Sequence, residues 1–183
     1  MRELRSAFAA VLTFTVLLGL AYPLLMTGAA QVAFPAKADG LDTLVARDFS
    51  KRADVFQSRP SVTGYSATAT FFNNQGPNQD ELAAQLKGYV RAYLKRERPY
   101  TPGLTAAQIP SDAVTTSASG VDPDISEANA RIQANRVAAL RHLPRPRVLA
   151  LVRKHASRPL FGLAGDRSVN VVALNRALEE VAS

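Results

Sequence analysis

The chain has 183 residues, of which 47% are hydrophobic and 20% are charged, and it contains no cysteine. A chain of this length holds one compact domain beside a membrane segment, which excludes a large multidomain enzyme and a polytopic transporter acting alone. The lack of cysteine excludes disulfides, thiolate metal sites and a cysteine nucleophile. The formal net charge is +7, but the cations alternate with acids along helix-like segments. We therefore interpret them as solvated helix faces and expect no nucleic-acid partner.

An uncharged apolar segment lies near the N-terminus. Residues 7–26 contain no charged side chain, and as a helix with a rise of about 1.5 Å per residue they span the roughly 30 Å hydrocarbon core of a bilayer. We predict a cytoplasmic tail at residues 1–6, a transmembrane helix at 7–28 and an extracytoplasmic domain at 29–183. The alternative is a signal peptide cleaved near Ala36-Lys37-Ala38, although signal h-regions, at about 7–15 residues, are shorter than this segment.

The charges that flank the apolar segment predict its orientation. Arg2 and Arg5 precede it directly, whereas Lys37 follows at a distance, close to Asp39 and Asp42. Under the positive-inside rule the N-terminus then lies in the cytoplasm and the domain lies outside. In a bacterium, this is a single-pass protein of the inner membrane with its domain in the periplasm or at the cell surface.

Thr15, Gly19 and Pro23 recur every four residues and therefore share one face of the predicted membrane helix. Small residues at this spacing let two membrane helices approach closely, so this face is a candidate for packing on a neighbouring helix. An equally good interpretation is that Gly and Pro are simply common in membrane helices. Because Pro23 has no N–H to donate to the carbonyl of Gly19, we expect the helix to kink there.

Strand-like and helix-like segments alternate irregularly beyond the apolar segment. Their β-branched and small residues predict short strands at residues 43–46, 62–70, 113–116 and 168–172. Prolines, glycines and amides predict loops between them. The predicted fold class is α+β, with one N-terminal transmembrane helix followed by a single soluble α+β domain.

Capping residues and apolar spacing predict four helices in this domain. The first begins at Asn78 as N-cap and ends near Arg98, and the second begins after Ser126 as N-cap. We expect the second helix to turn Ala128, Ile132, Ala139 and Leu140 toward the core. The predicted helices cover residues 79–98, 127–142, 148–155 and 174–181.

No motif for catalysis is evident in the sequence. It contains no GxxxxGK[ST] loop, no GxGxxG and no GxSxG elbow. His142 and His155 fall at the ends of different helices and are too few for a metal site, so we predict no metal. Asp122 and Asp124 flank Pro123 before a helix, where acids usually complement the helix dipole. The residues indicate an anchored accessory domain, not an enzyme.

Five groups of residues, from the apolar start to the end of the chain, match a known family in the right order. The most specific is residues 116–126 (TSASGVDPDIS), which is followed by Gln133 and Arg136. On these residues the chain resembles the C subunit of the Kdp potassium-transporting P-type ATPase. The other matching segments are residues 4–7 with 21–25, 31–35 with 38–40, 56–61, and 169–171 with 174–178.

The resemblance implies a non-catalytic, accessory role in ATP-driven, high-affinity potassium import. The partners that it implies are a channel-like A subunit, a P-type B subunit that hydrolyses ATP, a small F subunit and the lipid bilayer. ATP and K⁺ then belong to the whole complex, and no cofactor is expected on this chain alone. The sequence has no Asp-Lys-Thr-Gly phosphorylation signature, which agrees with this role. The alternative is a membrane-anchored or secreted binding domain unrelated to transport.

The resemblance also implies a catalytic chaperone that raises the ATP affinity of the B subunit. A Ser-Gly loop followed by Gln is similar to a nucleotide-binding signature, and Ser119, Gly120 and Gln133 are the matching positions. A domain outside the cytoplasm does not meet cytoplasmic ATP, so we favour structural or interaction roles for these positions. The same interpretation covers the whole set of family-motif residues, which are Ser117, Ser119, Gly120, Asp122, Pro123, Gln133 and Arg136.

Two loops depart from the family pattern, because the chain is shorter after Gly40 and between Asn73 and Asn78.

The resemblance also suggests that the outer domain lies over the ion entrance of the channel subunit. A basic domain in that place repels cations unless acids face the ion path. We therefore expect acidic side chains there, with Asp112, Asp122 and Asp124 as the candidates.

Overall fold

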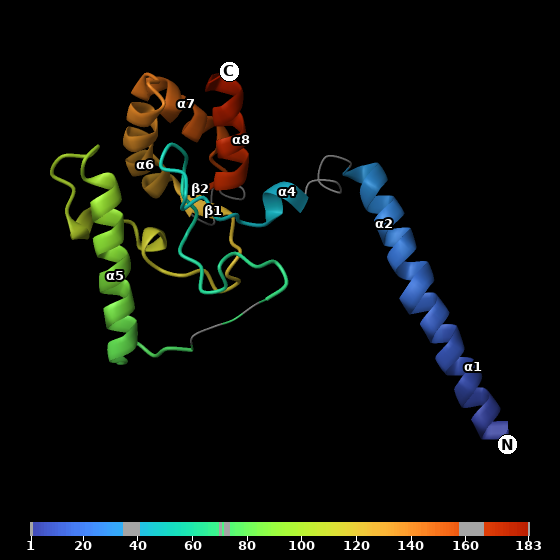
Figure 1. The fold of residues 1–183 in the computed structure, drawn as a ribbon. Coiled ribbons are helices and arrows are strands. Elements are labelled where there is room, and N and C mark those ends of the chain that lie inside the picture. Colours follow the sequence, from blue (N-terminus) through green and yellow to red (C-terminus); the bar gives the residue numbers. More distant parts are fainter. Residues whose placement is uncertain (1, 35–40, 70, 72–73, 158–166, 183) are drawn as a thin grey trace. The chain divides into compact units, whose positions relative to one another are not determined.

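The computed structural model describes residues 2–34, 41–69, 71, 74–157 and 167–182 (Figure 1). The chain divides into two compact units, Met1–Asp42 and Thr43–Ser183. Ala36-Lys37-Ala38, the cleavage site of the alternative signal peptide, lies outside the described residues, as do Asp39 and Asn73.

The first unit is dominated by a continuous helix, Arg2–Ala33, which among the described residues is the one helix long and apolar enough to cross a membrane. It consists of α1 (Arg2–Val16), a π-helical turn η1 (Leu17–Ala21) and α2 (Tyr22–Ala33). In the π-helical turn, the Tyr22 N–H donates to the Leu17 carbonyl, five residues back. The wider turn lies directly before Pro23, where the regular hydrogen bond from residue 23 to residue 19 has no donor.

The second unit is mostly helical and contains one small antiparallel sheet. Its two strands, β1 (Asp124–Ser126) and β2 (Ser168–Asn170), pair Ile125 with Val169. Between and around them lie α4 (Leu41–Leu44, which begins in the first unit), α5 (Asp80–Glu97), η2 (Ala106–Gln108), η3 (Ser111–Ala113), α6 (Glu127–Leu140), α7 (Arg145–His155) and α8 (Val171–Ala182). The prediction of mixed helix and sheet holds in this coarser form.

Three of the four predicted strands were wrong. Residues 43 and 44 end the α4 helix, residues 62–69 form turns and bends, and residue 113 ends the 3₁₀-helix η3. Short β-branched segments become strands only where a partner strand is available, and the sequence pattern does not report the partner. The fourth, near 168–172, is confirmed over Ser168–Asn170, after which α8 begins.

Helices α6, α7 and α8 lie together beside the sheet and enclose the main core (Figure 1). The predicted N-cap of α6 is confirmed, because the Ser126 Oγ accepts a hydrogen bond from the Asn129 N–H at 3.0 Å. The buried side chains of this core include Phe56, Ile125, Val137, Val148, Val152, Val169, Leu174 and Leu178.

The predicted core face of α6 was wrong. Ala128, Ala139 and Leu140 are exposed, and Ile132 is half-buried. The face that is buried instead carries Asn129, Gln133 and Arg136 beside small apolar residues. Ala130, Ala134, Val137 and Ala138 recur at helical spacing on this buried face, so the apolar pattern was present there and the prediction chose residues outside it. The polar side chains on the same face take buried positions because partners satisfy them.

Helix α5 supports a second, smaller core of Tyr93, Leu104 and Ala113. Its N-cap is Gln79, not the predicted Asn78, and no side chain caps it. The helix ends at Glu97, before Pro99, close to the predicted end. The last turn of α5 lies against the buried face of α6, because Glu97 accepts a hydrogen bond from Arg136 there.

Candidate functional site

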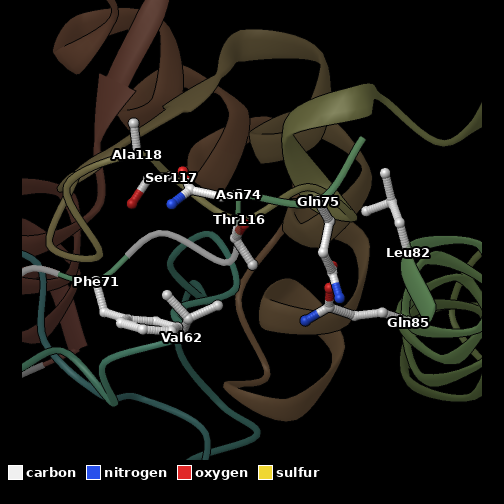
Figure 2. Close-up of a pocket in the computed structure, with 9 residues that line it drawn as sticks. All are labelled: Val62, Phe71, Asn74, Gln75, Leu82, Gln85, Thr116, Ser117 and Ala118. Carbon is white, nitrogen blue, oxygen red and sulfur yellow. The ribbon is translucent and has the colours of Figure 1, made fainter. Parts of the chain in front are cut away.

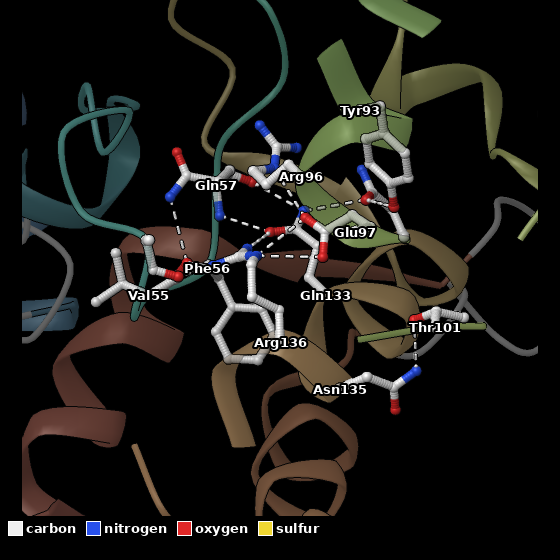
Figure 3. Close-up of polar contacts among 12 residues, drawn as sticks. Val55, Phe56, Gln57, Tyr93, Arg96, Glu97, Thr101, Gln133, Asn135 and Arg136 are labelled. Atoms are coloured by element: carbon white, nitrogen blue, oxygen red, sulfur yellow. Dashed lines mark hydrogen bonds and ion pairs between the residues drawn. The ribbon is translucent and has the colours of Figure 1, made fainter. Parts of the chain in front are cut away.

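The candidate site begins at Gln133, one of the predicted residues, which is 1% exposed on α6. Its Oε1 accepts hydrogen bonds from the Gln57 N–H at 2.7 Å and from Arg136 Nη2 at 3.1 Å. Its Nε2 donates to the Gln57 carbonyl at 3.2 Å (Figure 3). The same Nε2 donates to Asn129 Oδ1 at 3.0 Å. A side-chain amide has two donors and two acceptor lone pairs, so the capacity of Gln133 is filled within the domain.

Arg136, one turn further along α6, is also 1% exposed. Its Nε lies 3.1 Å from each carboxylate oxygen of Glu97, and its Nη1 donates to the carbonyls of Ala53 and, at 2.9 Å, Val55. Burial lowers the pKa of the Arg136 guanidinium, and the charge of Glu97 acts against that shift. The guanidinium therefore joins α6, the end of α5 and the chain around residue 55.

Glu97 is fully buried in the last turn of α5, where the helix dipole disfavours an acid. Two cations offset this placement: Arg136 inside the domain and Arg96, whose Nε lies 2.8 Å from Glu97 Oε1. The neighbouring Tyr93 donates from its hydroxyl to Asn129 Oδ1 at 3.0 Å, and burial raises the pKa of this phenol. An ion pair held in this way is a structural element with no free group for catalysis.

The segment Ala53–Gln57, which we call the clamped segment, is held by side chains from two helices. Gln133 of α6 binds both the N–H and the carbonyl of Gln57. Asn175 of α8 does the same for Phe56, at 2.9 Å for each bond. The amides thus replace the backbone partners that a strand would have in a sheet. Sequence reasoning missed Glu97, although an acid in the last turn of a basic helix is a signal that points to it. It included Gln57 and Asn175 only as members of the family segments 56–61 and 174–178 and gave them no role.

The loop before β1 contains the other predicted residues. Gly120 has φ +73°, and a Cβ there would lie 2.4 Å from Thr63 Oγ1. The Gly120 carbonyl accepts from Ser61 Oγ at 2.6 Å, and Asp122 forms an ion pair with Arg59 at 2.9 Å. Two segments that carry the family resemblance, residues 56–61 and 116–126, therefore meet in space.

The remaining residues of this loop contribute local contacts. Ser117 is buried, whereas Ser119 is exposed and its Oγ accepts from the Val121 N–H at 3.2 Å. The Pro123 carbonyl accepts from the Val171 N–H at 2.9 Å. No hydrogen bond joins Ser119 or Gly120 to Gln133 within the described part of the chain.

The acids proposed for an ion path are engaged inside the domain. Asp112 accepts from the Ser126 N–H and from Asn129 Nδ2, both at 2.9 Å. Asp122 holds Arg59 and also accepts from the Asp124 N–H at 3.0 Å, and Asp124 accepts from Ser168 Oγ at 3.0 Å. Each of these carboxylates thus has partners within the domain, and the expectation that they face a potassium path stays a prediction.

A pocket of about 290 Å³ opens beside this loop (Figure 2). Thr116 and Ser117 line one side, and Gln75 and Gln85 line another. The lining has amides, hydroxyls and apolar groups and no charged side chain, which does not suit a phosphate. Among the described residues, no three His, Asp or Glu side chains converge as a metal site.

The fold and this site define a class of protein: a small domain with a buried polar network, joined to one helix of membrane length. The family model described as "KdpC: K+-transporting ATPase, c chain" matches residues 4–180. The chain therefore belongs to the KdpC family.

Curated relatives agree with this assignment. The chain is 46% identical to the potassium-transporting ATPase KdpC subunit of Caulobacter vibrioides (strain NA1000 / CB15N), with 97% of this chain and 92% of the relative covered. It is 42% identical to that of Variovorax paradoxus (strain S110), covering 98% and 97%, and 39% identical to that of Methylorubrum populi, covering 98% of each. The last comparison extends over 204 positions, which is longer than this chain, so that relative has residues with no counterpart here.

Proposed function

We propose that the chain is the accessory C subunit of a bacterial K⁺-transporting ATPase complex, in which it assembles and stabilises the channel-like A subunit, the ATP-hydrolysing B subunit and the small F subunit. The observation that carries this proposal is the family match over residues 4–180, which includes both the apolar helix and the domain. The chain itself supplies no catalytic group in this proposal. Co-purification of a tagged chain with a P-type ATPase and a channel subunit from its own host tests it, and isolation of the chain alone would overturn it.

The proposed placement is single-pass in the inner membrane, with residues 1–6 in the cytoplasm, residues 7–28 in the bilayer and residues 29–183 outside. The support is the charge distribution, with Arg2 and Arg5 directly before the apolar helix. A reporter fused after Ser183 tests it. We expect activity from alkaline phosphatase and no fluorescence from a reporter that folds only in the cytoplasm, and the opposite pattern would reverse the placement.

We propose that the face with Thr15, Gly19 and Pro23 packs against a membrane helix of the complex. A Cβ built at Gly19 lies 4.0 Å from Thr15 Cγ2, so these two positions share a face, and a small side chain fits within the helix itself. Gly19→Ile therefore adds bulk only toward a neighbour, and we expect a reduced yield of complex. Gly28→Ile is the matched control, because Gly28 also has open space around it and lies on the opposite face of the same helix, nine residues from Gly19. Equal yields from the two variants would exclude packing through this face.

The effect on the ATP affinity of the B subunit is, in this proposal, exerted through the assembled complex and not through a nucleotide held by this chain. The support is that the hydrogen-bonding capacity of Gln133 is filled and that its side chain is buried. We expect a fluorescent ATP analogue to show no saturable binding to the isolated full-length chain. Saturable binding that Ser119→Ala abolishes would overturn this part of the proposal, since Ser119 is exposed and available.

A further inference from the structure

Helix α5 and its C-cap residue, Arg98, carry a row of cations that the proposed assembly role does not use. Lys87, Arg91, Lys95 and Arg98 are all exposed. Their spacings of four, four and three residues place them within an arc of about 80° on a helix with 3.6 residues per turn. They extend over about 16 Å of the helix axis at a rise of about 1.5 Å per residue. We call these four residues the basic stripe.

No acid neutralises the basic stripe within the described part of the chain. None of its four members takes part in an ion pair there, and Arg98 donates only to the Leu104 carbonyl, at 2.8 Å. The single acid in this half of α5, Glu97, points inward to Arg136. Burial of Glu97 therefore leaves the outer surface with positive charges alone, a concentration that favours an anionic partner.

An open groove of about 570 Å³ lies along the same surface. Arg91, Lys95 and Arg98 line it together with the apolar side chains of Leu94 and Pro99. Ammonium and guanidinium groups beside apolar carbon suit a ligand that has a phosphate next to less polar parts. A phospholipid headgroup has this composition, whereas a free phosphate ion uses the cations alone.

The chain also keeps this domain close to a bilayer. Nine residues separate Ala33, the end of the apolar helix, from Thr43, where the second unit begins. A fully extended chain of that length reaches at most about 35 Å, so Thr43, the first residue of the second unit, stays within that distance of Ala33. Tethering of this kind raises the effective concentration of a weak binding surface.

We propose that the basic stripe on α5 binds the phosphate groups of anionic lipids in the membrane to which the chain is anchored. This inference rests on the proposed retention of the apolar helix in the bilayer. Lys and Arg near an anionic surface each add to the attraction, and the attraction decays within a Debye length of about 8–10 Å at physiological salt and about 3 Å at 1 M. The contact is thus specific to anionic lipids and sensitive to salt.

The absence of cysteine permits a direct test on the full-length chain. Ala84→Cys places a fluorescent probe at an exposed position on the face of the basic stripe. The labelled chain is reconstituted into nanodiscs of phosphatidylcholine alone or with about one third phosphatidylglycerol, each containing a lipid with a headgroup quencher. We expect quenching at least about twofold stronger in the anionic nanodiscs, and loss of that difference in 1 M NaCl. A probe at Ala128→Cys, an exposed position on α6, is the control, and its quenching reports how closely the domain approaches the lipid without the basic stripe.

Two variants with the same change in net charge separate the basic stripe from overall charge. The triple substitution Lys87→Gln, Arg91→Gln and Lys95→Gln removes the lipid-dependent quenching. The triple substitution Lys51→Gln, Arg153→Gln and Lys154→Gln, at exposed positions outside α5, preserves it. Thermal unfolding of each variant at the same temperature as the unsubstituted chain shows that the fold is intact.

Three outcomes decide between the explanations. Lipid-dependent quenching that only the α5 variant loses supports the proposal. Equal quenching in both nanodiscs, with the chain still co-eluting with them, overturns the proposal. The basic stripe would then be a candidate to bind an acidic surface of a partner protein. Failure of the chain to co-elute with any nanodisc overturns membrane anchoring itself, and with it the proposed function as well as this inference.

Discussion

Replacing Arg136 by Met tests the buried network most directly. The substitution preserves an apolar stem but removes the guanidinium that binds Glu97 and the carbonyls of Ala53 and Val55. Glu97 is fully buried and retains only Arg96, whose side chain is 36% exposed. Breaking a buried pair by removing one partner costs about 3–5 kcal/mol, and an unpaired buried carbonyl costs about 1–3 kcal/mol. Because such losses overlap, we expect about 4 kcal/mol, a large part of the 5–15 kcal/mol typical of a domain.

Urea unfolding of the full-length chain in detergent, followed by circular dichroism, measures this loss. With a slope of about 2 kcal/mol per molar urea, the midpoint of the domain transition falls by about 2 M. Arg131→Met is the control on the same helix, because Arg131 is 56% exposed in an i,i+4 pair with Glu127, and such a pair contributes less than about 0.5 kcal/mol. The double variant Arg136→Met with Glu97→Met loses less than the two single losses added together, because no charge is left buried. Equal midpoints for Arg136→Met and Arg131→Met would refute the reasoning.

Two further variants address other contacts. Gly120→Ala combines a positive φ with a Cβ 2.4 Å from Thr63 Oγ1, and we expect it to destabilise the domain by about 2–3 kcal/mol. Gly103→Ala is the control, because Gly103 has φ +82° in open space and its substitution costs only about 1 kcal/mol. Equal urea midpoints for the two variants would show that the contact with Thr63 is irrelevant. Glu179 accepts hydrogen bonds from Arg141 and Arg52, which lower its pKa from 4.5 to about 2, so its stabilisation is complete above pH 4.5 and is lost as the pH falls toward 2. Glu179→Gln therefore lowers stability by less than about 1 kcal/mol at pH 7 and by progressively less below pH 4.5. Urea unfolding of the variant and of the unsubstituted chain across this pH range measures the difference, and a loss that stays constant with pH would contradict it.

Local rules predicted the elements whose causes are local. The apolar helix, the Ser126 cap and the end of α5 before Pro99 follow from residues within a few positions of each other. Three of the four predicted strands failed because a strand needs a distant partner. The burial of Gln133 and Arg136 on α6 could not be predicted for the same reason, because Gln133 is satisfied by Gln57, 76 residues away, and Arg136 by Glu97, 39 residues away. Polar residues on a helix indicate solvent unless such partners are known.

The candidate site was predicted by resemblance, and the structure gives its residues a physical role. Gln133 and Arg136 hold the clamped segment, Asp122 holds Arg59, and the Gly120 carbonyl receives Ser61. The segments that match the family thus contact each other, and their polar groups are used up in that contact. These residues hold the small domain in one arrangement, and their polar groups already have partners inside it. Binding to other molecules is therefore expected at surfaces whose side chains have no partner within the domain. The two surfaces that we propose for binding are the Gly19 face of the apolar helix and the basic stripe, so variants there are expected to impair assembly or lipid contact while the domain still folds.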